Sequence, residues 1–357
     1  MRRLPRTMLV LLAFAVAASA VAAATYASTK KSSATAEICV LLPDSKSSVR
    51  WETQDRPRLG AAFKSLGDSY SIVNAEGSAS TQLNQAQQCL TNGAKVILLV
   101  NLDSGSGAAI EKLAKSKGAQ TVDYDRLTLK GDQSYYVSFD NTAVGKLQGQ
   151  GLVSCLKASG EYGKHPVIAE LNGSPTDNNA TLFANGYNSV LNPLYKNGTF
   201  KKGPNQSVPA WDNQKALTIF QGMLTQTSNN IQGVAAANDG LGNAVVSALK
   251  SANLKPIPVT GQDATAQGVQ NILSGWQCMT VYKSIAAEAA AAASVADGIL
   301  HGKPINTKGK TVNDGSRNVP SVLLTPVAIT KNNWTVLLSD HFLKKSDVCT
   351  GEYAKYC

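Results

Sequence analysis

Short apolar runs alternate along the chain with longer stretches in which apolar residues recur at helical spacing. The apolar runs, each of strand length, are 38–42, 96–100, 167–171, 234–237 and 257–260. The longer stretches between them include 106–117, 142–156, 213–225 and the alanine-rich 285–300. Alternation of buried strands and helices predicts right-handed βαβ units in a parallel sheet, and therefore an α/β fold.

Polar side chains stand where several of these apolar runs end. Asp125 follows one run and is beside Arg126, and Asp263 follows another and is beside Gln262. Similar polar endings occur at 135–141, 234–239 and 279–283. In an open parallel sheet, ligands bind in the crevice outside the carboxyl ends of the strands. The pattern therefore predicts a small-molecule site built from strand ends.

Residues 1–24 are typical of a secretory signal peptide. Arg2, Arg3 and Arg6 precede an apolar stretch at 8–18, and small residues suited to cleavage follow it. The stretch is shorter than the about 20 apolar residues that a membrane-spanning helix needs. Residues 25–36, rich in Ser, Thr, Lys and Ala, are predicted to be a flexible leader. Because the first cysteine is Cys39, we expect no lipid-anchored N-terminal cysteine, and a secreted, periplasmic or cell-surface protein.

Length and charge narrow the class further. A mature chain of roughly 330 residues exceeds what one hydrophobic core usually holds, so two domains are expected. The formal net charge is +10, but the basic residues form isolated pairs and no basic run. This distribution favours a solvated basic surface over nucleic-acid binding, and no segment of the predicted mature chain indicates stable membrane insertion.

Six cysteines behind a signal peptide predict disulfides formed in an oxidising compartment. Cys349 and Cys357 would close the tail at 346–357, and Cys39 with Cys89 is a second candidate pair. The spacing shows no CxxC and no Cys/His group, so neither a zinc site nor thioredoxin-like chemistry is predicted.

The residue types at the strand ends suit a ligand rich in hydroxyl groups. Asp, Asn, Gln and Arg offer planar, fixed sets of acceptors or donors, and tryptophan offers a rigid apolar face to a sugar ring. Each residue also has a simpler structural interpretation. Asp140, Asp177 and Asp239 precede helical stretches as N-caps would, Trp211 could belong to the core or to the rim of a site, and Arg126 could pair with a surface carboxylate.

Taken together, the motifs resemble the type I sugar-binding family of bacterial ABC importers, which includes ribose- and galactose-binding proteins. The likeness covers about 38–342, and the order and spacing of many motifs carry it. These motifs are Arg50-Trp51, Asp55-Arg56, Tyr124-Asp125-Arg126, Ser138-Phe139-Asp140-Asn141, Gly173 to Ala180 (GSPTDNNA), Asn238-Asp239, Gly261-Gln262-Asp263-Ala264, Met279 to Lys283 (MTVYK), Val319-Pro320-Ser321 and Leu324-Thr325-Pro326.

The resemblance implies two Rossmann-like lobes joined by three hinge crossings, near 139, within 263–277 and within 320–325. The first lobe would comprise 37–139 plus 264–320, and the second 140–263 plus 321–345. Sugar hydroxyls would be contacted by Arg50, Asp125, Arg126, Asn179, Asn238, Asp263 and Lys283, and the sugar ring would stack on Trp51 and Trp211. The family needs no catalytic residue, metal or cofactor, and lobe closure on the sugar is the expected motion.

The resemblance further implies a monomer that delivers a monosaccharide, with D-xylose as first candidate, to an ABC permease. Glucose, ribose and arabinose remain open as ligands, because hydroxyl stereochemistry is read by distances finer than sequence supplies. An extracellular sugar sensor for a membrane receptor is the alternative role. A glycosidase is disfavoured, because it would need two carboxylates with pKa values pushed apart, whereas Asp125 lies beside the cation Arg126.

Overall fold

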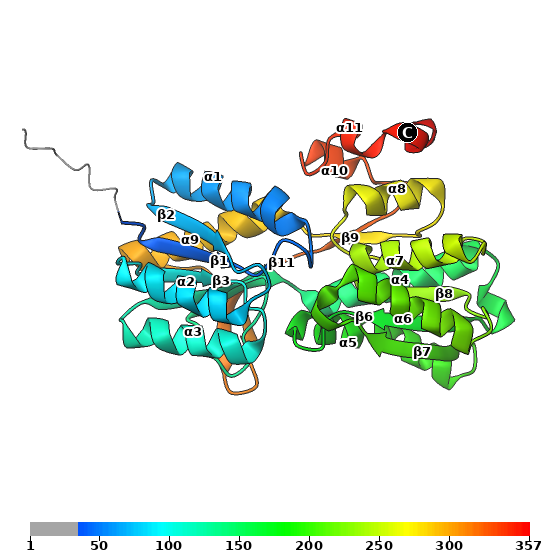
Figure 1. The fold of residues 1–357 in the computed structure, drawn as a ribbon, viewed down its shortest axis with the longest axis horizontal. Helices are drawn as coiled ribbons and strands as arrows, with labels where there is room; N and C mark the ends of the chain where they lie inside the picture. The colour runs from blue at the N-terminus through cyan, green and yellow to red at the C-terminus, as the bar shows by residue number, and fades with distance from the viewer. Residues whose placement is uncertain (1–34) are drawn as a thin grey trace, which may run out of the picture. The chain divides into compact units, whose positions relative to one another are not determined.

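The computed structural model describes residues 35–357, which form a seven-stranded sheet, a three-stranded sheet and a two-stranded sheet with helices around them (Figure 1). The predicted signal peptide, and all of the predicted leader except residues 35 and 36, lie outside the described residues. Within the described residues, no helix is long and apolar enough to cross a membrane. The α/β fold class predicted from the alternating pattern is confirmed.

The first lobe is built on the seven-stranded sheet, with strand order β10-β11-β5-β4-β3-β1-β2. From β2 to β11 the neighbours are parallel, and β10 is antiparallel to β11. Its strands are β1 (Ile38–Leu42), β2 (Tyr70–Asn74), β3 (Val96–Leu99), β4 (Gln120–Tyr124), β5 (Tyr135–Phe139), β10 (Thr311–Asn313) and β11 (Asn318–Leu324). β2 lies on one side of β1, and β3 and the strands after it lie on the other, so the strand order reverses between β1 and β3. Such a reversal in a parallel sheet leaves a crevice at the carboxyl ends of these two strands.

Helices cover both faces of this sheet (Figure 1). The helices are α1 (Arg56–Leu66), which follows a π-helical turn at Trp51–Asp55, α2 (Ala79–Thr91), α3 (Ser104–Ser116) and α9 (Ile285–His301). Leu59 and Phe63 of α1 pack with the alanines of α9 against one face, and α2 and α3 pack against the other. The alanine-rich stretch is thus a core helix, whose small side chains allow close approach to the strands.

The second lobe repeats the same strand order on a smaller scale, β7-β6-β8, with a separate antiparallel pair formed by β9 and β12. The strands are β6 (Val167–Asn172), β7 (Lys201–Ser207), β8 (Gly233–Ala236), β9 (Thr280–Tyr282) and β12 (Val327–Ile329). The helices are α4 (Asn141–Ala158), α5 (Asn178–Lys196), α6 (Asn213–Gln226), α7 (Asp239–Ser251) and α8 (Ala266–Ser274), with short turns at Tyr162–Lys164 and Pro209–Trp211.

Two expectations about the strands are wrong. Residues 257–260 form no strand beyond a single bridge from Val259 to Val234, because Pro256 and Pro258 lack the N–H groups that a ladder needs. The sheets are also not wholly parallel, since β10 and β12 pair antiparallel.

The chain passes between the lobes three times, at β5 to α4, at β9 to α9, and at β11 to β12. The crossing near 139 lies where it was predicted. The prediction that residues 264–283 belong to the first lobe is wrong, because β9 pairs with β12 and Cys278 is bonded to Cys155 of α4. Residues 321–324 were assigned to the second lobe, yet they pair with β5 of the first. Local sequence could not reveal these long-range partners.

Three disulfides join all six cysteines. Cys39–Cys89 lies in the first lobe, and Cys349–Cys357 closes the tail, as both candidate pairs predicted. Cys155–Cys278 is the third pair and lies in the second lobe. After β12 the chain forms α10 (Val336–Ser339) and α11 (Lys345–Val348), and a 3-10 turn at Gly351–Tyr356 lies in the tail.

The amino-terminal ends of α4 and α5 are held together by close helix packing. A Cβ on Gly145 of α4 would overlap the backbone carbonyl of Phe183, and one on Gly186 of α5 would overlap that of Thr142. This contact matters for the site below, because Asn141 in the first turn of α4 donates to Asn179 of α5 at 2.9 Å.

We therefore expect Gly145→Ala to lower the free energy of unfolding by about 1–3 kcal/mol, the usual effect of overpacking a tight core contact. The matched control is Gly222→Ala in α6, where a Cβ meets no neighbour. That change should raise stability by up to about 1 kcal/mol through helix propensity. Urea denaturation measures both, and a neutral Gly145→Ala would show that the helices can separate without loss.

Candidate functional site

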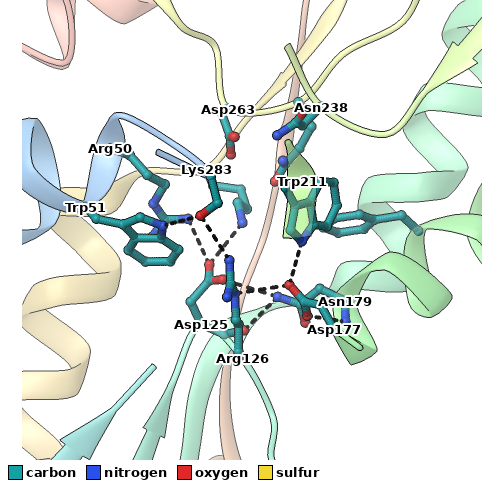
Figure 2. Close-up of a pocket in the computed structure, with 13 residues that line it drawn as sticks. Arg50, Trp51, Asp125, Arg126, Asp177, Asn179, Trp211, Asn238, Asp263 and Lys283 are labelled. Atoms are coloured by element: carbon teal, nitrogen blue, oxygen red, sulfur yellow. Dashed lines mark hydrogen bonds and ion pairs between the residues drawn. The ribbon is translucent and has the colours of Figure 1, made fainter. Parts of the chain in front are cut away.

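All nine sequence-predicted site residues line a single cavity between the lobes (Figure 2). They are Arg50, Trp51, Asp125, Arg126, Asn179, Trp211, Asn238, Asp263 and Lys283. Four further residues, Ser47, Asp177, Phe183 and Gln262, complete the lining. The structure therefore gathers into one place side chains that are spread over more than 230 positions of sequence.

Strand ends supply four of the nine candidate side chains. Asp125 and Arg126 directly follow β4, and Lys283 directly follows β9. Asn238 follows β8 and caps α7, its side-chain oxygen accepting from the N–H of Leu241 at 2.9 Å. This arrangement leaves its amide N–H group free of the capping bond. The cavity thus lies in the crevice outside the carboxyl ends of the strands, where the sequence pattern predicts a small-molecule site.

The remaining candidate residues come from turns, from a loop and from the start of α5. Arg50 and Trp51 begin the π-helical turn before α1, and Trp211 ends the short turn before α6. Asn179 lies in the first turn of α5, behind the N-cap Asp177. Asp263 lies in the loop between Gln262 and α8.

Three of the candidate residues have backbone φ angles that L-residues rarely adopt. The φ angles are 62° at Asp125, 56° at Trp211 and 100° at Asp263. Each such position costs on the order of 1–3 kcal/mol and persists only where surrounding contacts impose it. At Asp125 the carbonyl oxygen accepts from Tyr136 Oη at 3.0 Å, from Ser138 Oγ at 2.9 Å and from Asn179 Nδ2 at 3.0 Å. Strain gathered at one cavity indicates a functional site.

Arg50 is the centre of a buried charge cluster. Its guanidinium donates to both oxygens of Asp55, at 2.8 and 2.9 Å, to Asp125 at 2.8 Å and to Glu288 at 2.8 Å. Lys283 Nζ donates to the same Asp125 oxygen at 3.0 Å. The guanidinium fork thus joins the turn before α1 to β4 and to α9.

The cluster contains three carboxylates against two cations, and this imbalance sets the pKa values. Burial opposes the charge of Asp125, but Lys283, Arg50 and Arg126 outweigh it and hold its pKa below the ordinary value. Burial dominates at Glu288 and raises its pKa to about 8, with Arg50 only partly opposing the shift. A proton on Glu288 therefore brings the cluster close to neutrality.

Asp263 also faces the cavity, but its pKa is shifted in the opposite direction from that of Asp125. Burial raises its pKa, and the charges of Lys283 and Arg50 offset only part of that increase. Its backbone N–H donates to Val281 of β9 at 2.9 Å, and its carboxylate accepts from Ser48 Oγ of the first lobe at 3.4 Å. The Asp263 carboxylate therefore has acceptor capacity left for a ligand.

The two tryptophans flank the cavity from opposite lobes (Figure 2). The guanidinium of Arg50 lies 4.5 Å from the ring centre of Trp51, and that of Arg126 lies 5.4 Å from it. Trp211 packs edge-on against Phe183 with 6.4 Å between ring centres. Both rings are buried and held by neighbours, so they present rigid apolar faces.

Of the three aspartates interpreted as possible N-caps, two are caps and one is not. Asp140 and Asp177 are N-caps as expected, each accepting from a backbone N–H of its helix at 2.9 Å. Asp239 is not a cap: it is the first residue of α7, buried, and accepts from Gln277 Nε2 at 2.8 Å. Arg126 pairs with the buried Asp177 at 3.0 Å and not with a surface carboxylate.

Sequence reasoning did not select Ser47, Asp177, Phe183 and Gln262 as site residues. Gln262 and Asp177 stood within motifs that had been singled out, and their neighbours were chosen instead. Asp177 shows why, since one of its oxygens caps α5 while the other accepts from Trp211 Nε1 at 3.1 Å. A capping pattern gives no signal of a second role. Ser47 and Phe183 carry no distinctive sequence signal.

The charges that line the cavity balance. Arg50, Arg126 and Lys283 face Asp125, Asp177 and Asp263. Such a set offers fixed donors and acceptors without net charge, which suits a neutral polyhydroxylated ligand. One group among the described residues, Asp68, Asp297 and His301, has the spacing of a metal site, but it does not line this cavity and Lys303 is paired with Asp297.

Comparison with known proteins agrees with this geometry. The family profile described as a periplasmic binding protein domain matches residues 38–304. The D-xylose-binding periplasmic protein of Escherichia coli K12 is 34% identical over 301 residues, which cover 84% of this chain and 88% of that protein. The multiple sugar-binding periplasmic protein SbpA of Azospirillum brasilense is 33% identical over 311 residues, covering 83% and 86%.

Solved structures give the same result. An ABC transporter solute-binding protein from Clostridium phytofermentans with bound β-D-glucose superimposes with a TM-score of 0.80 at 27% identity. The match covers 87% of this chain and 99% of that one.

The charge imbalance around Glu288 predicts a pH effect on stability. Because its folded-state pKa of about 8 lies above the ordinary value of 4.5, the folded state binds more protons than the unfolded state between these values. The free energy of unfolding should fall by about 2 kcal/mol from about pH 6 to about pH 8 through this group. The titratable groups that interact with it are Arg50, Asp55, Asp125, Lys283, Tyr124 and Tyr136.

Glu288→Gln removes the titration and keeps an oxygen for Arg50, so its stability should fall less over the same pH range. Chemical denaturation across pH measures the difference in slope. Glu352→Gln, at an exposed site in the tail, is the control and should keep the wild-type slope. Equal slopes for wild type and Glu288→Gln would show that Glu288 stays ionised throughout.

Proposed function

Because the chain belongs to the periplasmic binding protein family, as a sugar-binding protein of ABC transporters and not an enzyme, we propose that it binds one neutral monosaccharide in the cavity between its lobes. D-xylose is the first candidate ligand. The observation that carries the proposal is the single cavity in which three buried cations face three buried carboxylates between two tryptophans. A sugar needs both donors and acceptors, and an apolar face for its ring C–H groups.

Each side chain then has a distinct role. Asp125, held ionised by its cations, accepts from sugar hydroxyls, and Arg126 donates to them. Asn179 and Asn238 contribute amide groups from the second lobe, and Asp263 accepts at the opposite wall. Arg50 and Lys283 both orient Asp125 and face the cavity, while Trp51 and Trp211 flank the ring.

One observation favours a pentose. The relative from Escherichia coli is named for D-xylose and is 34% identical over most of both chains. Glucose remains the alternative, since the solute-binding protein from Clostridium phytofermentans was solved with β-D-glucose. Ribose and arabinose differ from xylose in hydroxyl stereochemistry.

The biological role follows from the same family. The protein acts outside the cytoplasm as a monomer, closes its lobes on the sugar and presents the closed form to an ABC permease. Delivery to a membrane sensor is the alternative role, and it would use the same closed form. The solved structure from Clostridium phytofermentans is named as an ABC transporter solute-binding protein, which favours import.

A calorimetric screen of the mature protein against free D-xylose, D-glucose, D-ribose and L-arabinose tests the ligand. We expect reversible one-to-one binding that is tightest for D-xylose, without turnover of the sugar. Tighter binding of D-glucose would replace the pentose assignment. No heat and no thermal shift with any of the four would overturn the proposed function.

Asp263→Ala should weaken sugar binding by roughly 2–5 kcal/mol, because it removes one partner from a buried, charge-assisted set. The control is Asp132→Ala, an exposed aspartate of the first lobe paired with Lys115, which should leave the dissociation constant unchanged. Calorimetry with the tightest sugar of the screen measures both. Wild-type affinity in Asp263→Ala would remove this residue from the site.

A further inference from the structure

A group of three side chains able to bind a metal lies in the first lobe, away from the sugar cavity. Asp297 and His301 belong to the last turns of α9, and Asp68 lies in the connection between α1 and β2. The helix α9 begins just after Lys283, which lines the cavity, and is roughly 25 Å long. The group therefore lies at the opposite edge of the sheet, where β2 begins.

One ring nitrogen of His301 faces both carboxylates. Its Nε2 lies 3.2 Å from Asp68 Oδ1 and 3.6 Å from Asp297 Oδ1. The ligand atoms that the three side chains offer all lie within 4.8 Å of one another. Zinc binds imidazole nitrogen and carboxylate oxygen at about 2.0–2.2 Å, which places two ligand atoms of a tetrahedral site about 3.4 Å apart. The two measured separations lie on either side of this value, so the side chains already have the spacing of zinc ligands.

Hydrogen bonds do not satisfy this group. An imidazole nitrogen carries at most one proton, so Nε2 of His301 can donate to only one of the two carboxylates. The other oxygen of Asp68, Oδ2, is buried and has no hydrogen-bond partner within residues 35–357. The Asp68 side chain is only 1% exposed, so water does not compensate for the missing donor. A cation bound to the Asp68 carboxylate would supply this compensation.

Charge and access also favour a divalent cation. Asp68 and Asp297 are two buried carboxylates at the carboxyl end of α9, where the helix dipole adds partial negative charge. Lys303 donates to both oxygens of Asp297 at 2.8 Å, but its side chain is 57% exposed. Lys303 can therefore turn into solvent and release Asp297 to a metal. His301 is 47% exposed, which leaves one side of the group open to water.

We propose that Asp68, Asp297 and His301 bind a divalent transition metal, with Zn²⁺ as the reference ion and water completing its coordination. The mixed nitrogen and oxygen donors favour such an ion over Ca²⁺ and Mg²⁺, which take oxygen ligands. The metal would join the connection after α1 to the end of α9 and stabilise the first lobe, because a ligand that binds only the folded protein raises its apparent stability. The site shares no residue with the sugar cavity, so it does not depend on the proposed function.

Calorimetric titration of the metal-free mature protein, without an affinity tag, with zinc chloride tests the site. We expect one-to-one binding, and a melting temperature several degrees higher when zinc is in excess. His301→Asn keeps a side-chain N–H donor but removes the imidazole ligand, so it should weaken zinc binding more than about tenfold. The matched control is His165→Asn in the second lobe, which should keep wild-type affinity. His165 is exposed, and asparagine tolerates its left-handed backbone.

Lys303→Gln separates a metal site from a simple group of ion pairs. It removes the cation that competes for Asp297, so zinc binding should tighten by about twofold to fivefold, the usual strength of an exposed ion pair. Unchanged or weaker binding in this variant would show that Asp297 is not a ligand and would overturn the three-residue site. No zinc binding by wild type, or equal affinity in wild type and His301→Asn, would also overturn it. A failure of sugar binding would leave each of these outcomes unaffected.

Discussion

The arrangement of the site depends on one interaction, the guanidinium of Arg50 shared among three buried carboxylates. Asp55 lies in the turn that carries Arg50, Asp125 follows β4, and Glu288 lies on α9. These groups are 5, 75 and 238 positions away along the chain. Burying an unpaired charge would cost several kcal/mol, so each carboxylate must stay within reach of a cation. The position of Asp125 in the cavity follows from this requirement.

A second constraint acts on the backbone of the same residues. Asp125 and Asp263 have left-handed backbone angles, and each donates its N–H to a neighbouring strand, to Val137 and to Val281. These backbone hydrogen bonds hold the strained residues, and the side chains of both line the cavity. The site is preorganised by its scaffold, so a ligand need not order it.

Each disulfide joins two cysteines of the same part of the molecule. Cys39–Cys89 lies within the first lobe, Cys155–Cys278 within the second and Cys349–Cys357 within the tail, so none of the three ties the lobes to each other. The lobes are instead linked by three crossings and by polar contacts such as Arg126–Asp177. The disulfides can thus stabilise each lobe, and the lobes can still move relative to each other when the ion pairs and hydrogen bonds between them break.

The sequence alone determined the α/β class and the approximate strands and helices, because hydrophobic periodicity is a local signal, and the resemblance of its motifs to the sugar-binding family selected the nine residues that meet in one cavity. Tertiary structure decided what depends on distant partners. Residues 264–283 joined the second lobe through β12 and Cys155, and Pro256 and Pro258 prevented the strand expected at 257–260. The same reason applies to Asp177, whose capping pattern is local but whose partner Arg126 lies in the other lobe. Which carboxylate carries the extra proton was also beyond the sequence, since it depends on the burial and charges that the fold assembles around Glu288.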